Sequence, residues 1–150
     1  MRRSRRKVLK AGAALAAVSA ASATFAGRAF AQAAPLKIGM SMPQTGTLGA
    51  GGQAALVALR LWVDDVNQKG GLLNRKVELI AYDDQTNPAN VPGIYTKLLD
   101  VDKVDLLIAP YGTVPTAPIM PMVKQRGLLL MGNFSFQVSA KVQHDMWFNN

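Results

Sequence analysis

The sequence of 150 residues contains no cysteine and a single histidine. The absence of cysteine excludes a disulfide scaffold, a thiol nucleophile, thiolate metal ligands and a lipid-modified N-terminal cysteine. His144 has only Asp145 beside it, so we expect a surface or structural histidine and no metal site. A serine nucleophile motif is also missing, and no second histidine is available as its base, which disfavours nucleophilic catalysis.

Acidic residues are absent from the first 31 positions, which hold seven basic residues. The whole chain has a formal net charge of +8, which by itself would suggest a nucleic-acid or membrane-surface partner. Residues 32–150, however, contain ten basic and nine acidic residues, a net charge of +1. The basic balance therefore belongs to the N-terminus, and we predict no nucleic-acid partner.

The N-terminal segment has the three-part layout of an export signal. The basic motif S-R-R-K-V-L-K at 4–10 precedes an uncharged run at 11–26, in which nine of sixteen residues are alanine. Arg28 and a small-x-small cleavage site at 29–31 follow this run. Sixteen mildly apolar residues are fewer than the roughly 20 that a membrane span needs, which disfavours an anchor.

The paired arginines resemble the consensus read by the twin-arginine export machinery, with Val8 where phenylalanine is usual. The mild hydrophobicity of the run also fits that route. We therefore predict a signal peptide at 1–31, cleavage near Ala31, and a periplasmic chain at 32–150.

The exported part alternates apolar runs with helix-like stretches, which predicts an α/β fold with a parallel sheet and flanking helices. The predicted strands lie at 36–42, 77–82, 104–109 and 128–131. The predicted helices lie at 53–69, from Asn87 or Asn90 onward, and from Thr113 toward Arg126.

Ligands bind such sheets beyond the carboxyl ends of the strands, where loops are expected at 43–52, 83–87, 111–116 and 132–136. The glycine-rich first loop lacks convincing dinucleotide spacing and the lysine of a P-loop, so its glycines are interpreted as permitting close approach. Asp83 and Asp84, adjacent at a strand end, should point opposite ways, which favours a turn or cap role over acid–base catalysis.

Hydroxyl and backbone N–H groups are the better binding candidates. Gly112 and Thr113, with Thr116, begin a predicted helix, where free N–H donors and the positive dipole end would receive a carboxylate. The alternative is that Thr113 only caps its own helix, and the sequence favours neither interpretation.

A second candidate group follows the fourth predicted strand. Phe134, Ser135 and Phe136 place one hydroxyl between two aromatic rings. This is either a polar platform with apolar walls, as an amino-acid ligand needs, or simply part of the core.

Two segments carry a family likeness: L-K-I-G-M-S-M-P-Q-T-G from Leu36, and W-V-D-D-V-N-Q-K-G-G-L-L-N-R-K-V-E-L-I-A-Y-D-D-Q-T-N-P from Trp62. They resemble the periplasmic substrate-binding proteins of ABC importers for branched-chain amino acids. The resemblance runs from about Leu36 to the last residue and implies the type I periplasmic-binding fold, in which two α/β lobes close on a ligand. It also implies an ABC permease as partner, with no catalysis and no cofactor.

Carried over by position, the resemblance places ligand contacts at Thr113 and at Phe134, Ser135 and Phe136. The segment at 134–136 departs from the small Ala-Ala-Thr-like platform of leucine binders. An aromatic stacking position of the family falls near Gly51, which has no side chain. We therefore expect an amino acid of branched-chain type or a related small molecule, with other amino acids, amides and small carboxylates also open.

The resemblance further implies that residues 32–150 are an incomplete first lobe, since family members are considerably longer. We expect weak ligand binding, or none, from this lobe alone. A periplasmic sensory module of the same fold is an alternative function. An exported α/β enzyme is the least favoured alternative, because no metal or nucleophile motif is visible.

Overall fold

The structure is a computed structural model that describes residues 33–133 and 145–148. The predictions for the leader, for His144 and for Phe134, Ser135 and Phe136 lie outside the described residues. Within the described part, no helix combines the length and apolarity needed to cross a membrane.

The described strands form a five-stranded parallel sheet in the order β2-β1-β3-β4-β5. The strands are β1 (Leu36–Ser41), β2 (Val77–Tyr82), β3 (Leu106–Ile108), β4 (Leu130–Met131) and β5 (Trp147–Phe148). The predicted α/β class is confirmed, and β5 extends the sheet beyond the four predicted strands.

Strand β3 is shorter than the apolar run that predicts it. The backbone N–H of Val104 still donates to the carbonyl of Leu98, outside the sheet, whereas that of Asp105 donates to Lys37 in β1, and the strand itself begins at Leu106. Val104, the one apolar residue of the predicted strand that precedes Leu106, packs against the core instead of joining the strand. The fourth run shortens in the same way, to Leu130–Met131.

Helix α2 spans Gly49–Gln68 and begins four residues before the predicted start. Glycine is a poor helix former, and the sequence therefore argued against a helix there. Gly52 is required by packing, because a Cβ at this position would lie 1.9 Å from the carbonyl oxygen of Pro43. At the other end the helix stops, as predicted, where the N–H of Gly71 donates to the carbonyl of Val66.

The two predicted starts of the second helix, at Asn87 and at Asn90, are each partly correct. A 3₁₀ turn, η1 (Pro88–Asn90), is capped by Asn87, whose Oδ1 accepts from the N–H of Ala89 at 3.0 Å. Helix α3 (Val91–Asp100) then begins, with Pro92 in its first turn.

The single helix predicted from Thr113 toward Arg126 is wrong. The chain instead forms α4 (Thr113–Thr116), the 3₁₀ turn η2 (Ala117–Ile119) and α5 (Met120–Gln125). Prolines recur every third residue through this stretch, and each lacks the N–H that a continuous helix would need.

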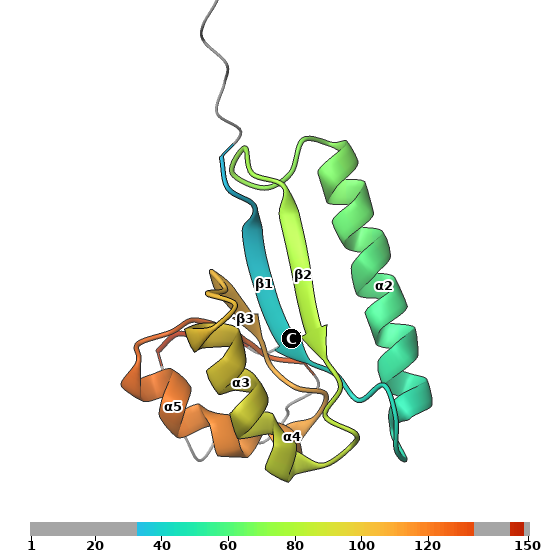
Figure 1. Cartoon of the computed structure of the whole chain (residues 1–150), viewed down its shortest axis with the longest axis vertical. Coiled ribbons are helices and arrows are strands. Elements are labelled where there is room, and N and C mark those ends of the chain that lie inside the picture. The colour runs from blue at the N-terminus through green and yellow to red at the C-terminus, as the bar shows by residue number, and fades with distance from the viewer. Residues whose placement is uncertain (1–32, 134–144, 149–150) are drawn as a thin grey trace, which may run out of the picture. The chain divides into compact units, whose positions relative to one another are not determined.

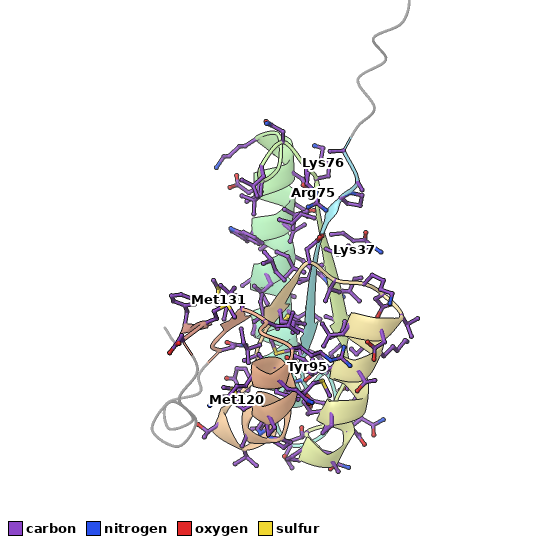
Figure 2. All side chains as sticks on the ribbon, turned by 90° about the vertical axis from the view of Figure 1, so that its left-hand side faces the viewer. Lys37, Arg75, Lys76, Tyr95, Met120 and Met131 are labelled. Atoms are coloured by element: carbon purple, nitrogen blue, oxygen red, sulfur yellow. The ribbon has the colours of Figure 1, made fainter. Side chains whose placement is uncertain are left out.

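The sheet is covered on both faces (Figure 1). Helix α2 packs on one face, where Leu56 meets Met40 and Met42. Helices α3 and α5 pack on the other, where the core holds Tyr95 and Met120 (Figure 2). Because side chains alternate along a strand, each central strand contributes residues to the cores on both faces of the sheet. The packed strands thereby fix the position of the edge from which the loops extend.

The amino end of the sheet is held by Arg75 (Figure 2). Its guanidinium donates to the carbonyl oxygens of Ala34 and Pro35, each at 2.7 Å, and pairs with Asp105 at 2.9 Å. This clamp lies at the end opposite the loops expected to bind ligand.

Candidate functional site

At the carboxyl edge of the sheet, Asp83 joins the loop after β2 to the loop after β1. Its carboxylate accepts from the backbone N–H of Gln44 at 2.8 Å and of Gln85 at 2.8 Å, and from Thr45 Oγ1 at 2.7 Å. Partial desolvation raises the pKa of Asp83, but these hydrogen bonds outweigh it and leave the pKa below its ordinary value. Asp83 is therefore an ionised clasp between two loops.

Thr86 makes a second link between the same loops. Its hydroxyl donates to the carbonyl of Thr45 at 2.9 Å and accepts from the N–H of Leu48 at 3.2 Å. The two loops are thereby held as one rim above β1 and β2.

Asp84 points inward, away from its neighbour Asp83, and is 2% exposed. It accepts from Ser41 Oγ at 2.9 Å and from the N–H of Thr86 at 3.0 Å. Burial raises the pKa of Asp84 above its ordinary value, although these hydrogen bonds counteract the rise. The predicted turn role of Asp83 and Asp84 is confirmed, since their carboxylates serve separate networks.

The threonines of the loop after β3 have distinct roles. Thr116 is buried, and its hydroxyl donates to the carbonyl of Gly112 at 2.6 Å, which closes the turn from within. Thr113 is half-buried and does not cap α4, because Gly112 occupies the N-cap position. The hydroxyl of Thr113 has no hydrogen-bond partner among the described residues. It is thus available to a ligand at the loop edge.

Gly112 connects two loops rather than presenting a free donor. Its φ of +105° lies in the region that favours glycine, and its N–H donates to the carbonyl of Asn133 at 3.1 Å. Helix α4 has only four residues, so the dipole contribution expected from a longer helix is largely lost. The end of this short helix therefore adds little to the attraction of an anion, and the Thr113 hydroxyl is the polar group that this turn leaves as a candidate contact.

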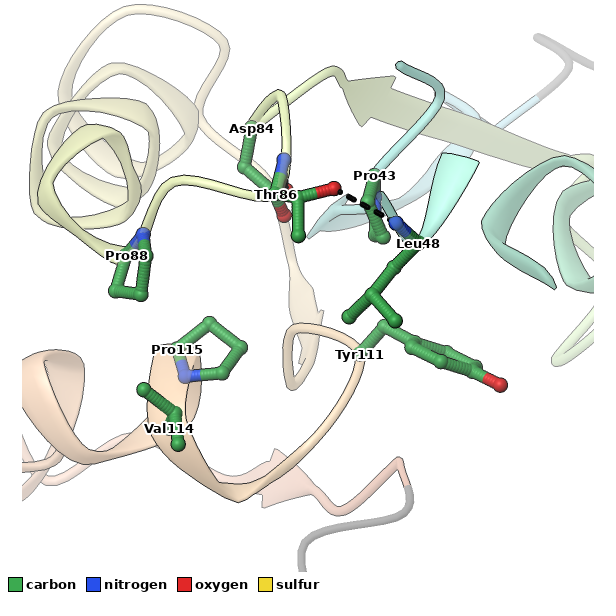
Figure 3. Close-up of a pocket in the computed structure, with 8 residues that line it drawn as sticks. All are labelled: Pro43, Leu48, Asp84, Thr86, Pro88, Tyr111, Val114 and Pro115. Atoms are coloured by element: carbon green, nitrogen blue, oxygen red, sulfur yellow. Dashed lines mark hydrogen bonds between the residues drawn. The ribbon is translucent and has the colours of Figure 1, made fainter. Parts of the chain in front are cut away.

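A hollow of about 140 Å³ opens between the loops after β1, β2 and β3 (Figure 3). Its lining comprises Pro43, Leu48, Asp84, Thr86, Pro88, Tyr111, Val114 and Pro115. All of these residues lie in or beside the loops that the sequence predicts at the carboxyl edge of the sheet. The sequence does not indicate that the three loops enclose a common hollow, which only the tertiary structure shows. Phe134, Ser135 and Phe136 lie outside the described residues, and Asn133 is the last described residue before them.

Tyr111 lies beside Gly51, in the first turn of α2. A Cβ at Gly51 would be 3.4 Å from the hydroxyl oxygen of Tyr111, an ordinary contact distance. The hydroxyl end of the ring points away from Pro88 and Pro115 (Figure 3), so the body of the ring forms a wall of the hollow. An aromatic residue directly before Gly112 was a signal that the sequence reading did not use.

Over residues 33–133 and 145–148, no group of three or more histidine, cysteine, aspartate or glutamate side chains is placed to hold a metal ion. The site instead combines an unpartnered hydroxyl, a rigid polar rim and an apolar hollow at the carboxyl edge of a parallel sheet. This is the architecture of a small-molecule binding lobe.

The chain belongs to the periplasmic binding protein family, which matches residues 35–149. This is a family of binding proteins and not of enzymes, and membership implies a periplasmic location. The resemblance to periplasmic substrate-binding proteins is confirmed by this family match.

Among relatives, the chain is 29% identical over 117 residues to the Leu/Ile/Val-binding protein BraC3 of Rhizobium johnstonii, covering 78% of this chain and 31% of that protein. The fold is similar to the branched-chain amino acid transporter substrate-binding protein LivJ of Streptococcus pneumoniae in complex with isoleucine. Here the TM-score is 0.69 and the identity 24%, over 77% of this chain and 33% of the other.

A third similar structure is an ABC transporter solute-binding protein of R. palustris in complex with benzoate. Its TM-score is 0.67 and its identity 24%, over 77% of this chain and 32% of the other. The chain thus spans about a third of the length of these relatives.

Proposed function

We propose that this chain belongs to the solute-binding component of an ABC importer and captures an amino acid of branched-chain type or a related small carboxylate. The observation that carries the proposal is an apolar hollow at the carboxyl edge of the sheet, lined in part by Val114. The preceding residue, Thr113, has a hydroxyl without a hydrogen-bond partner among the described residues. The relatives support the ligand class, since one is a Leu/Ile/Val-binding protein and two similar structures hold isoleucine and benzoate.

In the proposed mechanism, the hydroxyls of Thr113 and Ser135 hold the polar end of the ligand, with Phe134 and Phe136 beside it. Gly112 keeps the loop after β3 in place through its hydrogen bond to Asn133. Closure of a second lobe over this edge would complete the enclosure, and an inner-membrane permease with its ATPase would supply transport and energy. The chain itself performs no chemistry on the ligand.

We also propose that residues 1–31 are a twin-arginine signal peptide, cleaved near Ala31, and that 32–150 form an N-terminal ligand-binding lobe. The position of the compact unit supports this division, because it begins at Ala33, two residues beyond Ala31.

The function is tested by titrating the isotope-labelled chain with amino acids, their amides and small carboxylates and recording amide chemical shifts. One lobe encloses a ligand from one side only, so we expect dissociation constants of order 1 mM or weaker. The shifts should map to the loops after β1 and β3, and Thr113→Val should weaken them. A response to nucleotides or sugars, with none to amino acids, amides or carboxylates, would contradict the proposal.

A further inference from the structure

We propose that the free edge of β2 pairs with β2 of a second copy of this chain, in a two-fold symmetric dimer that joins two sheets into one. Strand β2 is the last strand in the sheet order, and β1 is its only strand neighbour in the described part of the chain. An unpaired strand edge exposes a row of N–H and C=O groups that can bind another strand. This interaction is separate from ligand binding and does not depend on the proposed function.

The backbone of β2 points alternately toward β1 and toward the free edge. The carbonyl oxygens of Lys76 and Tyr82 accept hydrogen bonds from N–H groups at the two ends of β1, so even-numbered residues face β1. The N–H and C=O groups of Val77, Leu79 and Ala81 therefore point outward.

Asn67 of α2 closes one end of this edge. Its side chain accepts from the N–H of Val77 at 2.7 Å and donates to the carbonyl of Val77 at 2.9 Å, as a neighbouring strand would. No side chain of the described residues bonds the backbone of Leu79 or Ala81 in this way. Both residues are half-buried and keep contact with solvent, although α2 runs along β2 (Figure 1). The open edge therefore consists of Leu79 and Ala81.

An antiparallel second copy satisfies these groups with its own identical ones. When the two-fold axis passes beside Ile80, Leu79 of each copy lies opposite Ala81 of the other. Each such pair exchanges two hydrogen bonds, and the two pairs together give four. An axis beside Leu79 would instead place Ala81 opposite Val77, whose groups Asn67 already occupies. The free groups thus select one register, and a patch that binds itself requires two-fold symmetry.

The side chains on the α3 face of β2 are complementary in charge in this register. Glu78 is exposed, and its side chain has no ion pair or hydrogen bond among the described residues. Glu78 would lie opposite Tyr82 of the second copy, on the same face because side chains alternate along a strand. The Lys97 ammonium lies 4.0 Å from the centre of the Tyr82 ring. Each Glu78 carboxylate therefore meets Lys97 of the other copy, and Ile80 meets its own counterpart between the two contacts.

Antiparallel pairing also separates the two candidate ligand sites. The carboxyl end of each β2 lies beside the amino end of the other, so the loops after β1, β2 and β3 of the two copies extend in opposite directions. A dimer of this kind therefore does not bring the two sites into contact.

Sedimentation equilibrium of the 150-residue chain tests the pairing. We expect a monomer–dimer equilibrium with a dissociation constant of order 0.1 mM, since small interfaces bind weakly. Glu78→Lys and Lys97→Glu each place like charges opposite one another and should raise this constant about tenfold or more. The two changes combined restore opposite charges and should restore the dimer, which also excludes unfolding as the cause of the single losses. Lys124→Glu is the matched control, since Lys124 is likewise an exposed lysine in the last turn of its helix, and should dimerise like the wild type.

Hydrogen exchange locates the interface. The amides of Leu79 and Ala81 should exchange more slowly as the chain concentration rises, whereas that of Val77, bonded to Asn67, should not change. A chain that stays monomeric up to about 1 mM, or single charge variants that dimerise like the wild type, would show that the proposal is wrong. Slow exchange of Leu79 and Ala81 without a change in mass would assign the edge to another segment of the same chain and overturn the dimer. These results leave the proposed ligand binding untouched.

Discussion

At the scale of single residues, Asp83 and Asp84 show how adjacent carboxylates acquire opposite properties. Asp83 accepts hydrogen bonds from two loops, which holds its pKa below the ordinary value despite partial desolvation. Asp84 is buried above the core, and desolvation raises its pKa. The two groups should therefore make stability depend on pH in opposite directions.

We predict that Asp84→Asn removes a loss of stability that the wild type shows as pH rises above 3.8, the ordinary pKa of aspartate. Because the folded pKa is raised, the unfolded chain releases its proton first. The free energy of unfolding therefore falls between 3.8 and the raised pKa and stays lower above it. Urea unfolding between pH 3 and 8 measures this, and identical pH profiles for variant and wild type would contradict it.

Asp83→Asn serves as the comparison within the same experiment. The lowered pKa of Asp83 means that its stabilisation is fully present above 3.8 and is lost as pH falls through the folded pKa. At neutral pH the variant should lose about 1–2 kcal/mol through weakened hydrogen bonds to the loop after β1.

At the scale of elements, the start of α2 depends on two neighbouring glycines with different surroundings. A Cβ at Gly52 would lie 1.9 Å from the carbonyl oxygen of Pro43, whereas at Gly51 the nearest atom would be the Tyr111 hydroxyl at 3.4 Å. Both residues are helical, so helix propensity affects them equally and only packing separates them.

We predict that Gly52→Ala destabilises the protein by about 1–3 kcal/mol, because the rim loop at Pro43 has to move. Gly51→Ala, the matched control, should be neutral or stabilising by up to about 1 kcal/mol through better helix propensity. Chemical denaturation of the two variants measures the difference. Equal stabilities would show that the Pro43 loop yields freely and that the rim is not rigid.

The elements also show where sequence reading succeeds. Alternating apolar positions in 77–82 and the turn chemistry of Gly70-Gly71 act over a few residues, so strand β2 and the end of α2 follow from local sequence. The break between α4 and α5 is equally local, since three prolines are visible there, but the prediction of one helix did not take them into account.

At the scale of the whole molecule, the uneven distribution of charge along the sequence matches the proposed division into a signal peptide and a ligand-binding lobe. The first 31 residues carry +7 and residues 32–150 carry +1. A net charge of +1 over residues 32–150 is too small to indicate electrostatic binding of nucleic acid and is compatible with the proposed binding of small solutes.

We predict that Arg5→Lys combined with Arg6→Lys keeps the chain in the cytoplasm with its leader uncleaved. Lysine preserves the charge but lacks the guanidinium pair that the twin-arginine machinery recognises. Arg2→Lys with Arg3→Lys is the matched control and should be exported normally. Cell fractionation and the mass of the exported chain provide the measurement, and unchanged export of the first variant would rule out the twin-arginine route.

The sequence by itself determined the charge division, the α/β class and the edge where ligand-binding loops gather, because periodicity and turn chemistry are short-range. It also led to Thr113, and only the tertiary structure showed that this residue does not cap its helix, because Gly112 occupies the N-cap position. The existence and the lining of the hollow follow from the tertiary structure alone. Its walls come from three loops far apart in the chain, and no local pattern records which side chains will face one another.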